Sequence, residues 1–234
     1  MFTTVRDRVA AATGALFVVL IVVGNQIDVS GTDQSAHPTG ASVLRDAAGA
    51  SSTAHTIGFV LEILGFLTLF GFLGYLVDAG RRAGAGKGGT ATAVAALAGL
   101  TTLIVKISSA APIGALAMDH ASVSPGLAQV LNDINGVGFV LAWLPWAVLV
   151  GAGALGLFQG GLVGRPTLAI GLLLGVAGVV MGLLGLHDPA NANALAWMAG
   201  LLWTLVVSVR LAVRPGTGRR ESEAPSPTRV AATV

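Results

Sequence analysis

The chain has 234 residues, of which 54% are hydrophobic and only 10% are charged. Soluble domains carry about 25% charged residues, so this composition excludes an ordinary water-soluble domain and indicates a membrane protein. Cysteine is absent, which excludes disulfides, thiolate metal sites and cysteine nucleophiles.

Six apolar segments follow one another along the chain, each close to the about 20 residues that a helix needs to cross a bilayer. Polar or turn-forming stretches such as "NQIDVSGTDQSAHPTG" separate them. We therefore predict an all-α fold, a polytopic integral membrane protein built as a six-transmembrane-helix bundle over residues 1–213. The predicted spans cover residues 9–26, 53–77, 91–117, 135–158, 167–187 and 194–213. The tail over residues 214–234 is rich in Pro, Ser and charge and is predicted to be disordered and cytoplasmic.

The first segment has two interpretations, because Arg6 and Arg8 precede an apolar run as they would in a signal peptide. No A-x-A-type cleavage site follows the run, which continues to Gln26. We expect an uncleaved first helix.

The basic residues fix the expected orientation. With the N-terminus in the cytoplasm, eleven of the 13 basic residues fall on the cytoplasmic side, Arg45 falls outside and Lys106 lies within the membrane. This distribution follows the positive-inside rule and predicts a cytoplasmic (plasma) membrane protein with both termini inside. The arginines are therefore expected to meet lipid head groups, so nucleic acid is not a predicted partner. The bilayer is the predicted partner, and a homo-oligomer or a second membrane protein stays open.

All four histidines and several aspartates fall in or beside the predicted outer loops. A divalent metal ion could be held there if five of them converge, namely His55, His120, His187, Asp119 and Asp188. No tight ligand spacing such as H-E-x-x-H is present. The alternative is that these are ordinary loop residues, and we predict no cofactor.

Two charged residues interrupt the apolar spans, Lys106 in "LTTLIVKISSAAPIG" and Glu62 in "TIGFVLEILGFLTLF". A lysine near the centre of a membrane helix costs about 2.5–3.5 kcal/mol, so such a residue needs a partner. At 1.5 Å per residue, both lie about 13 Å below the outer boundary, on helices that follow each other in the chain. We predict that they pair.

Helical spacing places small and polar residues around both charges. On the second span one face carries His55, Gly58, Glu62 and Gly65. On the third span one face carries Gly99, Thr102, Lys106 and Ser109. Small residues let helices approach closely, so we expect these two faces to pack against each other.

The predicted pair has two interpretations. In the first, Glu62, Lys106 and His55 line an outer-half cavity that binds or conducts a small solute or ion, because intramembrane ionisable residues are functional candidates. In the second, the pair is a structural lock in a non-catalytic scaffold or accessory subunit. No Walker loop, nucleophile elbow or dinucleotide fingerprint is present, and no catalytic residue is predicted. The lack of an internal repeat weakens a transporter interpretation.

The fourth span places Asn135, Phe139, Trp143 and Trp146 on roughly one face, and Pro145 is expected to kink it. This face is either a ligand pocket lined by tryptophan or a packing surface for the fifth span. The fifth span supports packing, because it contains two G-x-x-x-G steps formed by Gly171, Gly175, Gly178 and Gly182.

The stretches "AAATGALFVVLIVVG" and "HTIGFVLEILGFLTLFGFLGYL", together with six spans rich in small residues, resemble uncharacterised multi-pass membrane proteins of actinobacteria. These proteins are grouped as a domain of unknown function, and the resemblance covers residues 5–213. It implies a six-span membrane fold and brings no catalytic residues.

Overall fold

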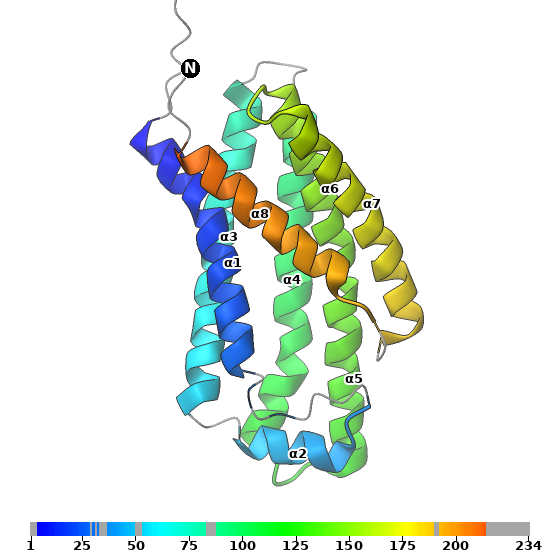
Figure 1. Cartoon of the computed structure of the whole chain (residues 1–234). Helices are drawn as coiled ribbons and strands as arrows, with labels where there is room; N and C mark the ends of the chain where they lie inside the picture. The colour runs from blue at the N-terminus through cyan, green and yellow to red at the C-terminus, as the bar shows by residue number, and fades with distance from the viewer. Residues whose placement is uncertain are drawn as a thin grey trace, which may run out of the picture.

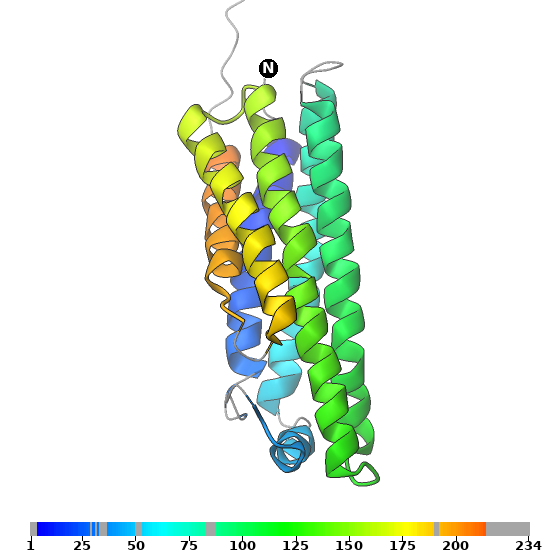
Figure 2. The same ribbon diagram turned by 90° about the vertical axis from the view of Figure 1, so that its right-hand side faces the viewer.

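A computed structural model describes residues 4–28, 30, 32, 37–49, 53–82, 88–189 and 192–213. In this part of the chain the ordered elements are helices, most of them aligned along one long bundle (Figures 1 and 2). They are α1 (Val5–Asp28), α2 (Gly40–Gly49), α3 (Thr53–Arg82), α4 (Gly89–Asp119), α5 (Pro125–Leu141), α6 (Trp143–Gln159), α7 (Arg165–His187) and α8 (Leu195–Val213). The predicted tail over 214–234 lies outside the described residues.

Six helical stretches are long and apolar enough to cross a membrane, as the sequence predicted. Five are α1, α3, α4, α7 and α8, and the sixth is formed by α5 and α6 in succession. The protein is therefore an all-α bundle with the helices of a multi-pass membrane protein. The helix of the fourth predicted span begins ten residues before that span, at Pro125.

The sixth stretch is interrupted at Ala142, between α5 and α6. Pro145 has no backbone N–H, so the carbonyl of Leu141 loses its usual helical donor. Helical hydrogen bonds continue on both sides, from the Ala142 N–H to the Gly138 carbonyl and from the Trp146 N–H to the Ala142 carbonyl. The kink was predicted at Pro145, between Trp143 and Trp146, whereas the helix is interrupted at Ala142, three residues before the proline.

One end of the bundle is marked by an ion pair between the start of α1 and the end of α3. The Arg82 Nη1 donates to the Asp7 carboxylate at 2.7 Å, and the Arg82 Nη2 lies 2.9 Å from Asp78. Asp7 also accepts the backbone N–H of Thr4, whose hydroxyl accepts the Asp7 N–H in return. This reciprocal arrangement is a capping box that begins α1.

The same end carries the start of α7 at Arg165 and the last turn of α8 with Arg210. We call it the basic end; in Figure 1 the start of α1 and the α6–α7 turn lie there. Arg45 belongs to α2, at the opposite end (Figure 1). The described arginines are thus separated between the two ends in the way that the sequence predicted.

Helix α2 was missed by the sequence analysis, which treated this region as part of a polar break. It lies at the opposite end, beside the turn that joins α4 to α5 (Figures 1 and 2). Its Val43 and Ala47 are buried with Leu116 of α4 and Ala128 of α5. Ten residues that include a basic and an acidic side chain are too few and too polar to produce a hydropathy peak.

Helix α7 packs through small residues, and its large aliphatic side chains face outward. The buried residues of α7 are all glycines, whereas its Leu173 is 68% exposed. A Cβ added at Gly175 would lie 3.0 Å from the Gly151 Cα of α6. The G-x-x-x-G face packs against α6 at Ala147 and Gly151, whereas the tryptophan face that was expected to meet it lies against α8. The outward leucines of α7 are typical of helices that contact lipid.

Candidate functional site

A cavity of about 170 Å³ lies among α1, α3, α4, α5 and α8. Its polar lining residues are Asn25, Gln26, Glu62 and Lys106. Its aromatic lining residues are Phe66, Phe139 and Trp197, and aliphatic side chains complete the wall. Figure 1 shows α1 and α8 crossing towards the basic end and separating towards the opposite end.

The two charged residues lie in the half of the bundle away from the basic end. Glu62 is nine residues after the start of α3, and Lys106 is thirteen residues before the end of α4. Because a helix rises 1.5 Å per residue, Lys106 is about 25 Å along α4 from the basic end.

Glu62 is positioned by the close approach of α1. A Cβ added at Gly24 would lie 3.0 Å from both the Cγ and the backbone nitrogen of Glu62, so only glycine fits there without a shift. The Asn25 side chain and Lys106 both interact with the Glu62 carboxyl group. The Glu62 side chain is half-buried and borders the cavity.

Lys106 has an aromatic partner. Its Nζ lies 3.8 Å from the centre of the Phe139 ring, within the range of a cation–π interaction. Among the described residues, no ion pair of 4.0 Å or less joins Lys106 to Glu62. The predicted partners therefore share one cavity and act on each other electrostatically, without a direct ion pair.

The expected contact between the two small-residue faces was wrong. The glycines of α3 pack against α1: a Cβ at Gly58 would lie 2.8 Å from the Gly24 carbonyl oxygen and 2.7 Å from the Asp28 nitrogen. A Cβ at Gly65 would meet Ile21 at 3.0 Å. Periodicity identifies the residues that share a face but not the helix that covers them.

The polar residues beside Lys106 on α4 are satisfied within their own helix. Thr102 is buried and its hydroxyl donates to the Ala98 carbonyl at 3.0 Å. Ser109 is buried and donates to the Lys106 carbonyl at 2.9 Å. Such bonds to the preceding turn satisfy a hydroxyl without a second helix or a ligand. Neither residue lines the cavity.

His55, which was expected to join the cavity, lies 3.3 Å from the Asp28 carboxylate. This contact connects the first turn of α3 to the last turn of α1, about two turns beyond Glu62. His55 is not among the residues that line the cavity.

The expected convergence of histidines and aspartates is not found in the part of the chain that the structure describes. There, no three His, Asp or Glu side chains come together in a group that could hold a metal ion. The Nδ1 of His120 lies 3.4 Å from the Ala117 carbonyl, next to Asp119 at the end of α4. His187 and Asp188 lie at the end of α7.

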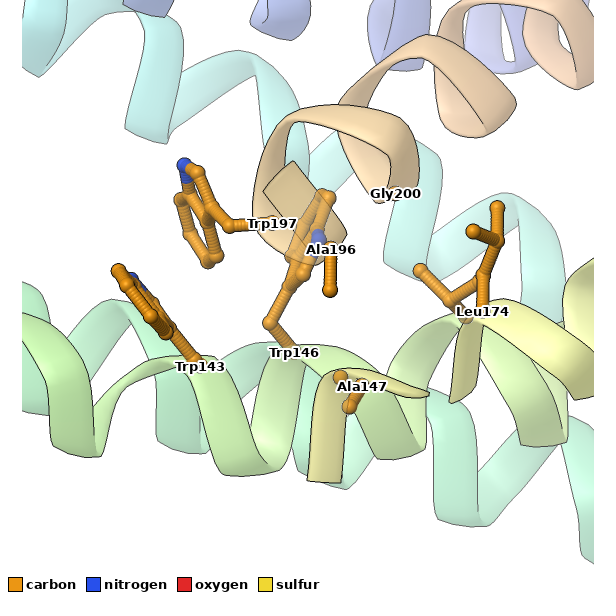
Figure 3. A pocket seen from close by; sticks show the side chains of 9 residues that line it. Trp143, Trp146, Ala147, Leu174, Ala196, Trp197 and Gly200 are labelled. Carbon is orange, nitrogen blue, oxygen red and sulfur yellow. The ribbon is translucent and has the colours of Figure 1, made fainter. Parts of the chain in front are cut away.

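The tryptophans of α6 form a packed cluster with α8. Trp143 and Trp146 are buried and border a void of about 10 Å³, whose wall includes Trp197 (Figure 3). The Trp146 and Trp197 ring centres are 5.0 Å apart, and Phe139 meets Trp143 edge-on at 5.7 Å. One water molecule needs at least about 10–15 Å³, so this void leaves no room for a larger ligand.

Asn135, expected on the same face, is half-buried and lines neither the void nor the larger cavity. Among the polar and aromatic residues that line the cavity, the sequence analysis did not single out Asn25, Gln26, Phe66 or Trp197. The sequence did hold a signal for Asn25 and Gln26. Their side-chain amides lie near the end of α1, at the same end of the bundle as the start of α3, the helix that carries Glu62.

Comparison of the chain with protein-family models, with curated proteins and with solved structures finds no match. The resemblance to uncharacterised actinobacterial membrane proteins stays a prediction from the sequence.

Proposed function

We propose that the protein is an integral membrane protein that binds a small polar solute in the cavity around Glu62 and Lys106. One observation carries the proposal: a carboxylate and an ammonium line the same cavity without contacting each other. Charged groups at membrane depth are costly, and their retention beside an open volume favours a role in binding. The cavity leaves both groups a face that a solute can reach.

The structural-lock alternative is less well supported. A lock derives its strength from direct, hydrogen-bonded contact between the two charges. Here Lys106 contacts the Phe139 ring. Glu62 interacts with the Asn25 side chain as well as electrostatically with Lys106. This arrangement favours solute binding over a purely structural pair in a scaffold or accessory subunit.

Packing below the cavity favours binding over conduction. Phe17 and Trp146 are both nearly fully buried, with ring centres 5.6 Å apart, on the side of the cavity that leads to the basic end. Leu201, which lines the cavity, is also almost fully buried. We therefore expect a solute to enter and leave through the opposite end.

Charge supports the proposed orientation. Arginines gather at the basic end, and the positive-inside rule assigns such an end to the cytoplasm of a plasma membrane. On this assignment both chain termini are cytoplasmic and the cavity opens to the outer side.

Cysteine labelling tests the proposal, because the natural chain contains no cysteine that would react in the background. Val22 lines the cavity, whereas its neighbour Val23 is 44% exposed on the outer surface of the bundle and provides a control at equal depth. In intact cells we expect an impermeant thiosulfonate to label Val22→Cys and to leave Val23→Cys unlabelled. An unreactive Val22→Cys, or equal labelling of both variants, would contradict a water-filled cavity that opens outward.

A further inference from the structure

The cavity combines one negative and one positive side chain, so its net charge is zero although its two walls differ in sign. We infer that its ligand is a small zwitterion, a molecule that carries one ammonium and one acidic group on a short skeleton. This inference rests on the proposed function and adds the chemical class of the solute.

The wall with Glu62 suits the cationic group. A carboxylate accepts hydrogen bonds from an ammonium, and the carbonyl oxygen of the neighbouring Asn25 amide is a second acceptor. Phe66 also lines the cavity, and an aromatic face attracts a cation electrostatically.

The wall with Lys106 suits the acidic group. An ammonium has three N–H donors, and the Phe139 ring meets it at one face only. The side-chain amide of Gln26 adds N–H donors to the same cavity. A carboxylate, sulfonate or phosphate group accepts hydrogen bonds, and these N–H groups can donate them.

Both charges together exclude a singly charged ligand. A lone anion beside Lys106 leaves Glu62 desolvated without compensation, and a lone cation leaves Lys106 in the same condition. Because more than 4.0 Å separates the two groups, a dipolar molecule between them compensates both at once.

Volume limits the size of the ligand. A cavity of about 150 Å³ accommodates benzene, so about 170 Å³ corresponds to a molecule of roughly six to eight non-hydrogen atoms. A free amino acid of the smallest kind fits, and so does the zwitterionic head group of a lipid. The shared chemistry is the ammonium and the acid on a short linker.

Thermal unfolding of the full-length protein in detergent tests the class with three small probes of similar size. They are β-alanine as the zwitterion, propionate as the anion and propylammonium as the cation. For the natural chain we expect β-alanine to raise the Tm by about 2 °C or more at saturation, and the two singly charged probes to leave it unchanged. Dihexanoyl phosphatidylethanolamine, tested in parallel, distinguishes a lipid head group from a free zwitterion.

Charge-neutral variants give the decisive contrast. Glu62→Gln is expected to respond to propionate, because only Lys106 remains charged, and Lys106→Gln is expected to respond to propylammonium. Asp133→Asn removes an exposed carboxylate outside the cavity and is expected to respond like the natural chain.

Two failures are distinguishable. If propionate or propylammonium raises the Tm of the natural chain as much as β-alanine does, the cavity binds a solute and the zwitterion assignment is wrong. If none of the four compounds shifts the Tm of the natural chain or of either cavity variant, solute binding itself is contradicted, and the zwitterion with it.

Discussion

The Lys106 ammonium group lies 3.8 Å from the centre of the Phe139 ring, on the helix that follows its own in the chain. The hairpin of α4 and α5 explains this contact. Lys106 is thirteen residues before the end of α4, and Phe139 is fourteen residues after the start of α5. The ring therefore meets the ammonium at matched depth and leaves Glu62 on another wall of the cavity.

The contact predicts an energetic coupling between Lys106 and Phe139. Phe139→Leu removes the ring that attracts the ammonium and also packs against Trp143 and Trp197. A double-mutant cycle with Lys106→Met isolates the cation–π contribution, for which we expect about 0.5–2 kcal/mol in the free energy of unfolding. Purely additive effects would show that the contact contributes nothing to stability.

Close packing of α6 and α7 predicts a cost for one added methyl group. Gly175→Ala places a Cβ 3.0 Å from the Gly151 Cα and 3.1 Å from the Ala147 carbonyl oxygen, and backbone atoms yield little. We expect a loss of about 1–3 kcal/mol in the free energy of unfolding. Gly74→Ala is the matched control, because a Cβ there meets no atom within 4 Å, and it is expected to be neutral or slightly stabilising.

The ion pair at the basic end predicts unequal effects of two neighbouring arginines. Arg82→Gln leaves the buried Asp7 without its charged partner, whereas Arg81 takes part in none of the ion pairs among the described residues. We expect Arg82→Gln to lower the free energy of unfolding by about 1 kcal/mol and Arg81→Gln to change it little. High salt should shrink the difference, and equal effects at low salt would contradict the assigned contact.

The cluster beneath α2 predicts a local effect. Ala47 is buried against α4 and α5, whereas Ala48 is exposed on the same helix. Ala47→Asp buries a charge and should release α2, which hydrogen exchange would show as faster exchange over residues 40–49 with the Tm of the bundle unchanged. Ala48→Asp adds the same charge and should keep natural protection; similar exchange in both variants would disprove the docking.

The fold was largely predictable, because hydropathy distinguishes the segments that suit a lipid bilayer from those that suit water. Six apolar stretches correspond to six helices able to cross a membrane. Where a helix extends beyond the apolar region, hydropathy does not distinguish it from a polar loop. The start at Pro125 and the whole of α2 were therefore missed, since packing between protein segments stabilises them.

The site was predictable only in part. Chain order and rise per residue placed Glu62 and Lys106 at similar depth, and both line one cavity. Their contacts depend on which helix faces which, and periodicity carries no such information. The glycines of α3 meet α1, and Lys106 meets the aromatic ring of α5. One sequence feature could have identified Phe139 as the partner of Lys106: the two residues are nearly equally far from the turn that joins α4 to α5.

The central claim is that Glu62 and Lys106 are separate walls of a cavity that holds a solute. A double-mutant cycle with Glu62→Gln and Lys106→Met, by reversible unfolding in detergent, tests it most directly. If the two groups face a shared cavity, we expect a coupling of about 1 kcal/mol or less, typical of charges that solvent reaches. Losses of about 3 kcal/mol or more for each single variant, with a nearly neutral double variant, would instead reveal a closed buried pair and contradict the account.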